Sequence, residues 1–239
     1  MVPYDVRFAR HSLLQNIHTN LTVYDMEPTT IFFLLALIFS IIVHEVSHGY
    51  AAEMLGDPTA RLQGRLTLNP IPHIDPIGSI LVPAILVFSG AGFLFGWAKP
   101  VPYNPYNLNN RKWGEAIVAG AGPAVNIFLA LVFGLVIRFG LGSLPENFVV
   151  LASTVVLINI LLALFNLLPI PPLDGSKLLR SVLPYKANMA FQRFEAMLMQ
   201  GGLLMMILVF WLLMSVFGSY FYLGISFVFT LFTGISIPF

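Results

Sequence analysis

His44, Glu45 and His48 form a HExxH motif inside a stretch of chain that is otherwise apolar, and residues 31–43 before it carry no charged side chain. In a helix, positions i and i+4 share a face, so the two imidazoles can bind one ion. An ionisable residue inside a membrane span is costly and therefore usually marks function. The motif predicts a zinc site on a helix that lies within the bilayer.

Glu45 lies beside the first histidine, where it can serve as general base for a water molecule activated by zinc. Hydroxide then attacks a peptide carbonyl, the metal stabilises the oxyanion, and the same Glu passes the proton to the departing amine. The alternative is a pair of packing histidines with a Glu that is paired elsewhere. That alternative is disfavoured because an unpaired Glu in a membrane is so costly.

A catalytic zinc needs a third protein ligand and one open position. Asp174 is the best candidate, at the end of the segment NLLPIPPLDG, residues 166–175. The prolines of this segment cannot continue a helix, and broken backbone at membrane depth is tolerated only where it lines a cavity or is buried in protein. Gly175 is free to take unusual dihedral angles. The alternative is an exit loop in which Asp174 caps the following helix.

Composition indicates an all-α polytopic membrane protein. The chain has 239 residues, of which 57% are hydrophobic and 10% charged, and its mean hydropathy is +0.84. It has no basic run of the kind that binds nucleic acid, and without cysteine any metal must be held by His and carboxylate. Apolar stretches long enough to span a bilayer occur at about 30–55, 115–138, 148–168, 197–217 and 219–236.

Segment 76–96 is also apolar, but Pro83 and the SGAG run at 89–92 interrupt it. It is either a sixth crossing or a re-entrant segment, which gives about five to six transmembrane helices. The ligand geometry favours re-entry. The histidines and Asp174 must reach one ion, so the ends of the first span and of the span at 148–168 must face the same side.

In that topology the basic residues divide unequally between the two sides. The side opposite the metal has only Arg7, Arg10 and Arg138, and the metal side has Arg61, Arg65, Lys99, Arg111, Lys112, Lys177, Arg180, Lys186 and Arg193. The positive-inside rule then places the site toward the cytoplasmic side of the cell membrane. Charge orients this topology, whereas the ligand geometry selects it.

We expect one transmembrane metalloprotease domain at 29–239, with a core at 30–185 and accessory helices at 197–236. Residues 1–28 lack the apolar core of a signal peptide. They mix apolar side chains with Arg7, Arg10 and His11, and are either an amphipathic helix at the interface or a disordered tail.

The chain resembles the site-2 protease family of intramembrane zinc metalloproteases. The resemblance rests on HEVSH at 44–48, AGPAVN at 121–126 and NLLPIPPLDG at 166–175, and it covers about 30–185. Further similarity, in NPIPHIDPIGS at 69–79 and GWAKPVPYNP at 96–105, is typical of the compact branch that has no PDZ or CBS domain.

This resemblance implies that Asp174 is the third zinc ligand, with one zinc per chain, and that Asn166 helps to orient the substrate or the transition state. It also implies transmembrane or membrane-anchored protein substrates. Asn126 either faces the site or hydrogen-bonds between helices. Gly120 and Gly122 are expected to permit close helix packing.

Other polar residues have simpler expected roles. His73 and Asp75 are expected in a surface turn, with gating or proton transfer as alternatives. Glu53 and Asp57 are expected to pair with Arg61 or Arg65 in the headgroup region. The extended stretch at 99–107 is a candidate for pairing with an unwound substrate as an added strand.

Two other functions use the same residues. A metal transporter or receptor would bind the ion for transit, but transport needs successive sites and the sequence shows one cluster. A catalytically silent member that binds membrane proteins would not need an intact Glu45. Both remain alternatives to the protease.

Overall fold

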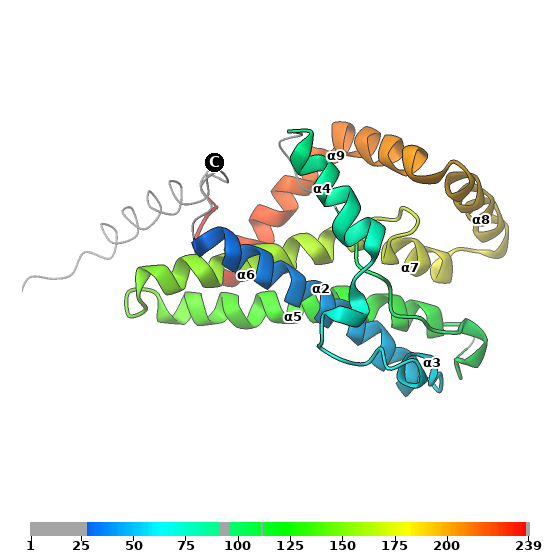
Figure 1. Ribbon diagram of the computed structural model, residues 1–239, viewed down its shortest axis with the longest axis horizontal. Helices are drawn as coiled ribbons and strands as arrows, with labels where there is room; N and C mark the ends of the chain where they lie inside the picture. The colour runs from blue at the N-terminus through cyan, green and yellow to red at the C-terminus, as the bar shows by residue number, and fades with distance from the viewer. Residues whose placement is uncertain (1–27, 91–95, 111, 238–239) are drawn as a thin grey trace, which may run out of the picture. The chain divides into compact units, whose positions relative to one another are not determined.

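The computed structural model describes residues 28–90, 96–110 and 112–237. All regular structure in these ranges is helical, as Figure 1 shows, which confirms the predicted all-α class. The predicted interfacial segment 1–28 lies outside the described residues except for Pro28.

Four described helices contain a stretch long and apolar enough to cross a membrane. Three of these stretches match the predicted spans closely, because uninterrupted apolar sequence of about 20 residues favours a spanning helix. The long helices are α2 (Pro28–Met54), α5 (Gly114–Gly140), α6 (Glu146–Asn166) and α9 (Gly202–Thr233).

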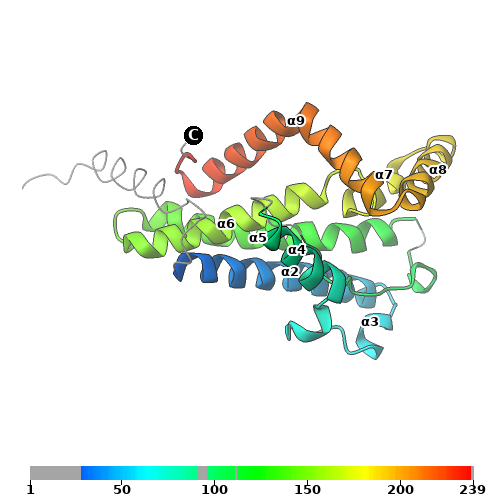
Figure 2. The same cartoon turned by 45° about the horizontal axis from the view of Figure 1, so that its top comes forward.

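Helix α9 replaces the two separate spans expected at 197–217 and 219–236. It continues through Gly218, because a glycine inside a helix costs only about 1 kcal/mol and the stretch has no proline. Figure 2 shows that the helix bends along its length. Its candidate span is Trp211–Thr233, so the described residues contain four such stretches where five to six were expected.

Shorter elements connect and follow these helices. Between α2 and α5 lie α3 (Thr59–Leu62), η1 (Ile71–His73), η2 (Pro76–Leu81), α4 (Val82–Phe88) and η3 (Pro105–Asn107). After α6 come α7 (Asp174–Val182) and α8 (Tyr185–Gln200).

Together η2 and α4 form one short apolar helix, Pro76–Phe88. At 1.5 Å per residue it is roughly 20 Å long, whereas the hydrocarbon core of a bilayer is about 30 Å thick. The length agrees with re-entry of segment 76–96, which stays a prediction because residues 91–95 are outside the described ranges.

The chain forms two compact units. Unit 1 comprises the described parts of 1–37, 126–165 and 193–239, and unit 2 comprises the described parts of 38–125 and 166–192. The single domain expected at 29–239 stays a prediction.

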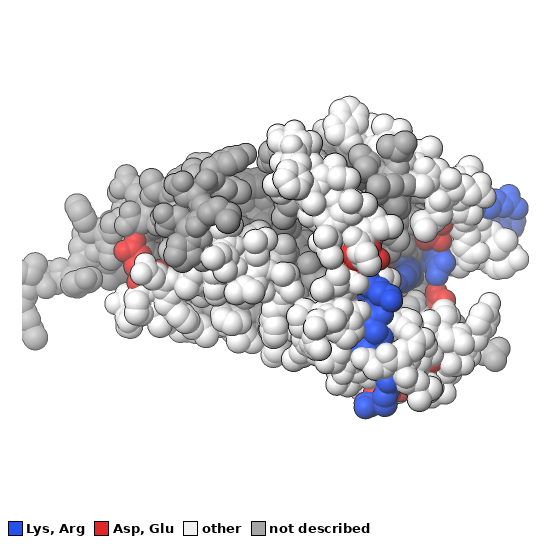
Figure 3. All heavy atoms as spheres, in the orientation of Figure 1, with Lys and Arg blue, Asp and Glu red and all other residues white. Residues whose placement is uncertain are grey.

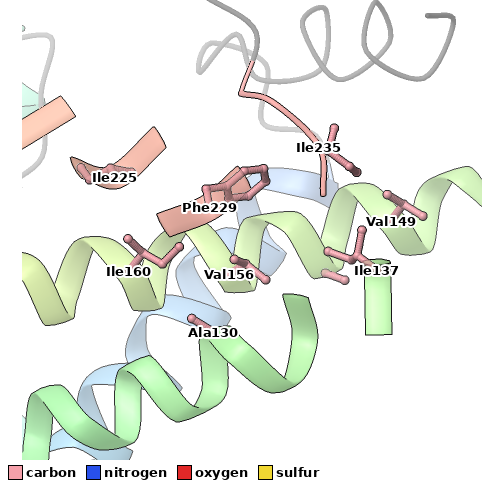
Figure 4. Packing of buried hydrophobic residues seen from close by; sticks show 9 residues of the cluster. Ala130, Ile137, Val149, Val156, Ile160, Ile225, Phe229 and Ile235 are labelled. Carbon is pink, nitrogen blue, oxygen red and sulfur yellow. The ribbon is translucent and has the colours of Figure 1, made fainter. Parts of the chain in front are cut away.

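Unit 1 has an apolar core, shown in Figure 4, to which α5, α6 and α9 contribute. Gly134 lets α9 come close, since a Cβ at this position would lie 2.7 Å from the Cβ of Phe232. The buried residues of the core are Ala130, Ile137, Val149, Ala152, Val156, Ile160, Ile225, Phe229 and Ile235.

Unit 2 contains the C-terminal part of α2 and the N-terminal part of α5, which lie side by side in Figures 1 and 2. Ala52, Leu108 and Val118 form its small buried cluster. Figure 3 shows a mostly uncharged face, with the basic side chains in one region of it and acidic side chains beside them. Among described residues, unit 1 has Arg138 and Arg193, and unit 2 has Arg61, Arg65, Lys99, Lys112, Lys177, Arg180 and Lys186.

The predicted topology can be tested by labelling single cysteines, because the chain has none of its own. Exposed Tyr106 and Lys186 should react with an impermeant maleimide from the same side of the membrane once each is replaced by Cys, and Ser143→Cys should react from the other side. Labelling of positions 106 and 186 from opposite sides would mean that segment 76–96 crosses fully.

Candidate metal centre

His44 and His48 lie one turn apart on α2, and both side chains are buried. Their rings meet edge to face with centroids 4.7 Å apart. Both Nε2 atoms point at the same carboxylate oxygen, Asp174 Oδ2, at 3.2 Å from His44 and 3.1 Å from His48. The spacing of the motif therefore produces the shared face that the sequence predicts.

Asp174 is the first residue of α7 and follows the proline-rich turn. The turn closes through hydrogen bonds from Ile170 N–H to Leu168 O and from Leu173 N–H to Ile170 O, each 2.8 Å long. Leu173 occupies the N-cap position. The carboxylate of Asp174 thus points at the imidazoles and is not the N-cap of α7.

Gly175 is needed for close approach of backbone and not for an unusual dihedral angle. It is absent from the glycines with positive φ. A Cβ at this position would lie 2.2 Å from the carbonyl oxygen of Leu167. Any side chain here would therefore push the turn away and move Asp174.

The Asp174 carboxyl is held in its charged form. Burial raises its pKa, but hydrogen bonds from His44 and His48, with the charges of His48 and Lys177, outweigh burial and hold the pKa well below its usual range. Lys177 Nζ lies 3.5 Å from Oδ1, the oxygen that does not face the imidazoles. The carboxylate form is the one that binds metal.

His48 is oriented by a partner on α5. Its Nδ1 lies 2.7 Å from the carbonyl oxygen of Val118. A carbonyl only accepts, so Nδ1 carries a hydrogen. When a metal takes the place of the hydrogen between Nε2 and Asp174, Nε2 presents its lone pair to that metal, a pattern typical of histidines that bind metal.

One ligand atom from each of His44, His48 and Asp174 lies within 4.8 Å of the others. Two imidazole nitrogens and a carboxylate oxygen that converge in a buried place fit a divalent cation. This donor set suits zinc, whose catalytic sites commonly take three protein ligands of these types. Among the described residues no other group of this kind occurs.

Gly122 of α5 lies directly against the ligand nitrogens. A Cβ here would be 2.5 Å from Nε2 of both His44 and His48. By contrast, a Cβ at Gly120 would make an ordinary contact of 3.7 Å with Leu178. Both glycines were expected to permit close packing, and at Gly122 the packing is against the metal ligands themselves.

Glu45 is half-buried on α2, and its Oε2 accepts a 2.8 Å hydrogen bond from the N–H of Val101. Val101 belongs to the extended stretch that follows Trp97. Sequence reasoning missed this contact, because it joins residues 56 positions apart through a backbone group.

The two asparagines lie in different surroundings. Asn126 is fully buried, and its Nδ2 donates a 2.7 Å hydrogen bond to Oδ1 of Asn159 within unit 1. This is the helix-to-helix bond that was one of the two expected roles. Sequence reasoning missed Asn159. Asn166 is the last residue of α6 and is half-buried in unit 2. The roles of Asn126 and Asn166 in catalysis stay predictions.

The expected pairing of Glu53 and Asp57 with arginines is half correct. Glu53 pairs with Arg61. Asp57 instead accepts hydrogen bonds from Thr59, from the N–H of Asn104 at 2.6 Å and from Asn107 at 2.8 Å. Burial raises the pKa of Asp57, but these hydrogen bonds outweigh it and lower the pKa.

His73 does not lie in the exposed turn that was expected. It is buried, and its Nε2 lies 2.9 Å from the carbonyl oxygen of Thr67. Asp75 does make a turn, since its Oδ1 accepts from the N–H groups of Ile77 and Gly78 at the start of η2. His73 is not part of the metal-ligand group.

The fold and the site define an integral membrane protein with a candidate metal centre whose ligands lie on the apolar helix α2 and at the start of α7. Comparison with known proteins agrees. Residues 142–209 match Peptidase family M50. The "Putative zinc metalloprotease YwhC" of Bacillus subtilis is 41% identical over 164 residues, which are 64% of this chain and 69% of that protein. The chain therefore belongs to Peptidase family M50, which confirms the resemblance to site-2 proteases.

More distant relatives carry similar names. The "Putative zinc metalloprotease Rip2" of Mycolicibacterium smegmatis is 32% identical over 72% of this chain and 63% of its own length. The "Zinc metalloprotease MJ0392" of Methanocaldococcus jannaschii is 27% identical over 63% of this chain and 34% of its own length. The chain thus spans only part of the length of these relatives. No solved structure matches the chain.

Asp174→Ala should weaken zinc binding. Changing even the outer partners of metal ligands typically costs roughly 10–100-fold in affinity, and loss of a direct ligand should cost at least as much. Metal content of the purified protein measures this, with Glu146→Ala, an exposed carboxylate at the start of α6, as the control. Unchanged tight zinc binding would refute the ligand role.

Gly122→Ala should also remove zinc, because its methyl group would collide with both ligand nitrogens. Gly120→Ala is the matched control on the same helix and should keep zinc. Alanine favours a helix over glycine by about 1 kcal/mol, so intrinsic helix propensity does not explain a loss. Equal zinc content in the two variants would contradict the geometry described here.

Proposed function

We propose that this chain is an intramembrane zinc metalloprotease that hydrolyses peptide bonds in or near transmembrane segments of membrane-anchored proteins. The observation that carries the proposal is the convergence of His44, His48 and Asp174 in a chain of long apolar helices. Membership of a peptidase family and the names of the relatives support it.

Zinc would be held by His44 Nε2, His48 Nε2 and Asp174, and when bound it would lower the pKa of water and polarise a carbonyl. Glu45 is the proposed general base. It takes a proton as water oxygen bonds to the peptide carbon, and it gives that proton to the amide nitrogen as the C–N bond breaks. Val101 holds one of its oxygens by a hydrogen bond.

Substrate peptide bonds in a transmembrane helix are hidden in internal hydrogen bonds, so the substrate must unwind before attack. Residues 97–104 of this protein have no regular secondary structure, and Val101 among them contacts Glu45. Pairing of this stretch with the unwound substrate stays a prediction. Asn166 and Asn126 are retained as candidates for orienting the substrate or the transition state.

We place the site near the cytoplasmic side of a cell membrane. The support is the uneven distribution of basic residues, most of which lie in unit 2 with the metal-ligand group. By analogy with the family, the proposed substrates are membrane-anchored regulators or leftover signal peptides.

A metal transporter is the main alternative. Transit across a membrane needs successive binding sites, and the described residues provide one group of three ligands. A carrier also has no use for a Glu beside its ligands. A catalytically silent binder of membrane proteins would tolerate loss of Glu45 equally well.

Glu45→Gln separates these functions. A Gln oxygen can still accept from Val101 N–H, so the substitution removes the base and preserves the contact. We expect cleavage of single-span test proteins by the wild-type protein in detergent, a loss of about 10²–10⁴-fold in the variant, and equal zinc content in both. Chelation should abolish the wild-type activity.

The control is Glu146→Gln, which removes an exposed carboxylate far along the chain from the motif. Cleavage that survives in Glu45→Gln would remove Glu45 from the role of base. Zinc flux into vesicles without any cleavage would favour the transporter.

A further inference from the structure

Val101 provides a single backbone hydrogen-bond donor next to Glu45. It lies between Pro100 and Pro102, and proline has no N–H. The N–H of Val101 is therefore the only backbone donor of residues 100–102, and it is directed at Oε2 of Glu45 over 2.8 Å. Lys99 and Val101 both precede a proline, which biases them toward extended backbone.

Arg65 binds carbonyl oxygens of the same stretch. Its Nη2 donates to the carbonyl oxygens of Lys99 at 2.8 Å and Pro100 at 3.2 Å. The carbonyl of Pro100 belongs to the same peptide group as the N–H of Val101. Arg65 thus fixes the peptide group whose other end bonds to Glu45.

Arg65 is buried, at 6% exposure, although it carries a permanent charge. Burial lowers the pKa of its guanidinium and the charge of Glu45 opposes that effect, so the two charges interact. A buried charge is costly unless it is paired and hydrogen-bonded. An arginine whose only task was to face lipid headgroups would have no reason to be buried here.

Further contacts fix both ends of the stretch. At its start, Trp97 N–H donates to Gly78 O at 3.1 Å, and Ser79 Oγ donates to Trp97 O at 2.8 Å. At its end, Asn104 N–H donates to Asp57 at 2.6 Å. The N–H groups of residues 97, 99 and 101 are all bonded, which is the alternation of an extended chain.

Helix α2 is shaped to receive Val101. Gly49 lies one turn after Glu45 and so shares its face. A Cβ at Gly49 would lie 2.8 Å from Cγ1 of Val101 and 2.5 Å from Cδ2 of Leu66. The absence of a side chain at position 49 lets the Val101 backbone come within hydrogen-bonding distance of Glu45.

We propose that Arg65 is a positioning residue for the proteolytic reaction, acting through the Pro100–Val101 peptide group to orient Glu45. This rests on the proposed role of Glu45 as base. With Oε2 held by Val101 N–H, Oε1 is the oxygen left to face water, and it has no hydrogen bond to any residue in the described ranges. A hydrogen bond to a charged acceptor such as the Glu45 carboxylate is stronger than a hydrogen bond between neutral groups.

The first test needs no substrate. Hydrogen exchange followed by mass spectrometry on a peptide covering residues 99–103 reports the amides of Val101 and Tyr103 only, because prolines contribute no amide hydrogen and the first residue of a peptide has none. Glu45→Ala and Arg65→Met should each speed exchange of the Val101 amide by about 10-fold or more, as expected when a bond of roughly 1.5 kcal/mol is lost. Unchanged exchange in Arg65→Met would overturn the proposal.

The second test measures catalysis. Arg65→Met should lower kcat by about 10–100-fold, since misplacing a catalytic group by about 1 Å costs up to 10²-fold. KM should stay within about twofold, and zinc content and the thermal transition should be close to wild type. Arg65→Lys keeps a charged donor and should restore part of kcat. The matched control is Arg61→Met, which removes an exposed arginine paired with Glu53 and should change none of these.

A loss of kcat that follows loss of zinc or of folded protein in proportion would make Arg65 a structural residue and overturn the proposal. The pair Val101→Pro and Val101→Ala settles the role of the donor itself. Both substitutions alter the side chain, but only Val101→Pro removes the N–H, so the loss of kcat should be larger in Val101→Pro than in Val101→Ala. If the wild-type protein cleaves nothing, the proposed function fails. The exchange result still shows whether Arg65 and Glu45 hold the Val101 amide.

Discussion

Two imidazole nitrogens and one carboxylate oxygen meet within a buried part of this helical chain, and the surrounding structure is arranged to allow it. Each atom is an electron-pair donor, and their close approach is favourable only with a cation or proton between them. Helix α2 supplies both imidazoles through one turn of spacing, and α7 begins with the carboxylate. The backbone of α5 approaches at Gly122, and the carbonyl of Val118 sets the tautomer of His48.

The polar residues around this centre mostly bind backbone. Arg65 binds two carbonyls, Asp57 binds an N–H of the same stretch, and Glu45 binds the N–H between the two prolines. An irregular segment has unpaired backbone groups that helices satisfy internally, so buried charged side chains are the available partners. The result is a non-helical stretch that is fixed in place next to the proposed base.

Sequence reasoning worked where residues act through regular spacing. The histidine pair follows from i and i+4 on one helix, and Asp174 follows from prolines that end α6 and leave a turn. It failed where the partner is a backbone group far away in the chain. Arg65 was expected to pair with a carboxylate and Asp57 with an arginine, but their partners lie 34 and 47 residues away in a loop without periodicity. The prediction of two separate spans where α9 lies was wrong for another reason, because Gly218 alone does not end a helix.

The bare backbone at Gly122 has a consequence for how anything reaches the candidate metal. A single methyl group at that point would overlap the ligand nitrogens of both histidines, so no atom of a substrate or inhibitor can enter between α5 and the imidazoles. The main chain of α5 closes the site on that side. A metal-chelating inhibitor must therefore come in from another direction, and its fit will be decided by the side chains found there.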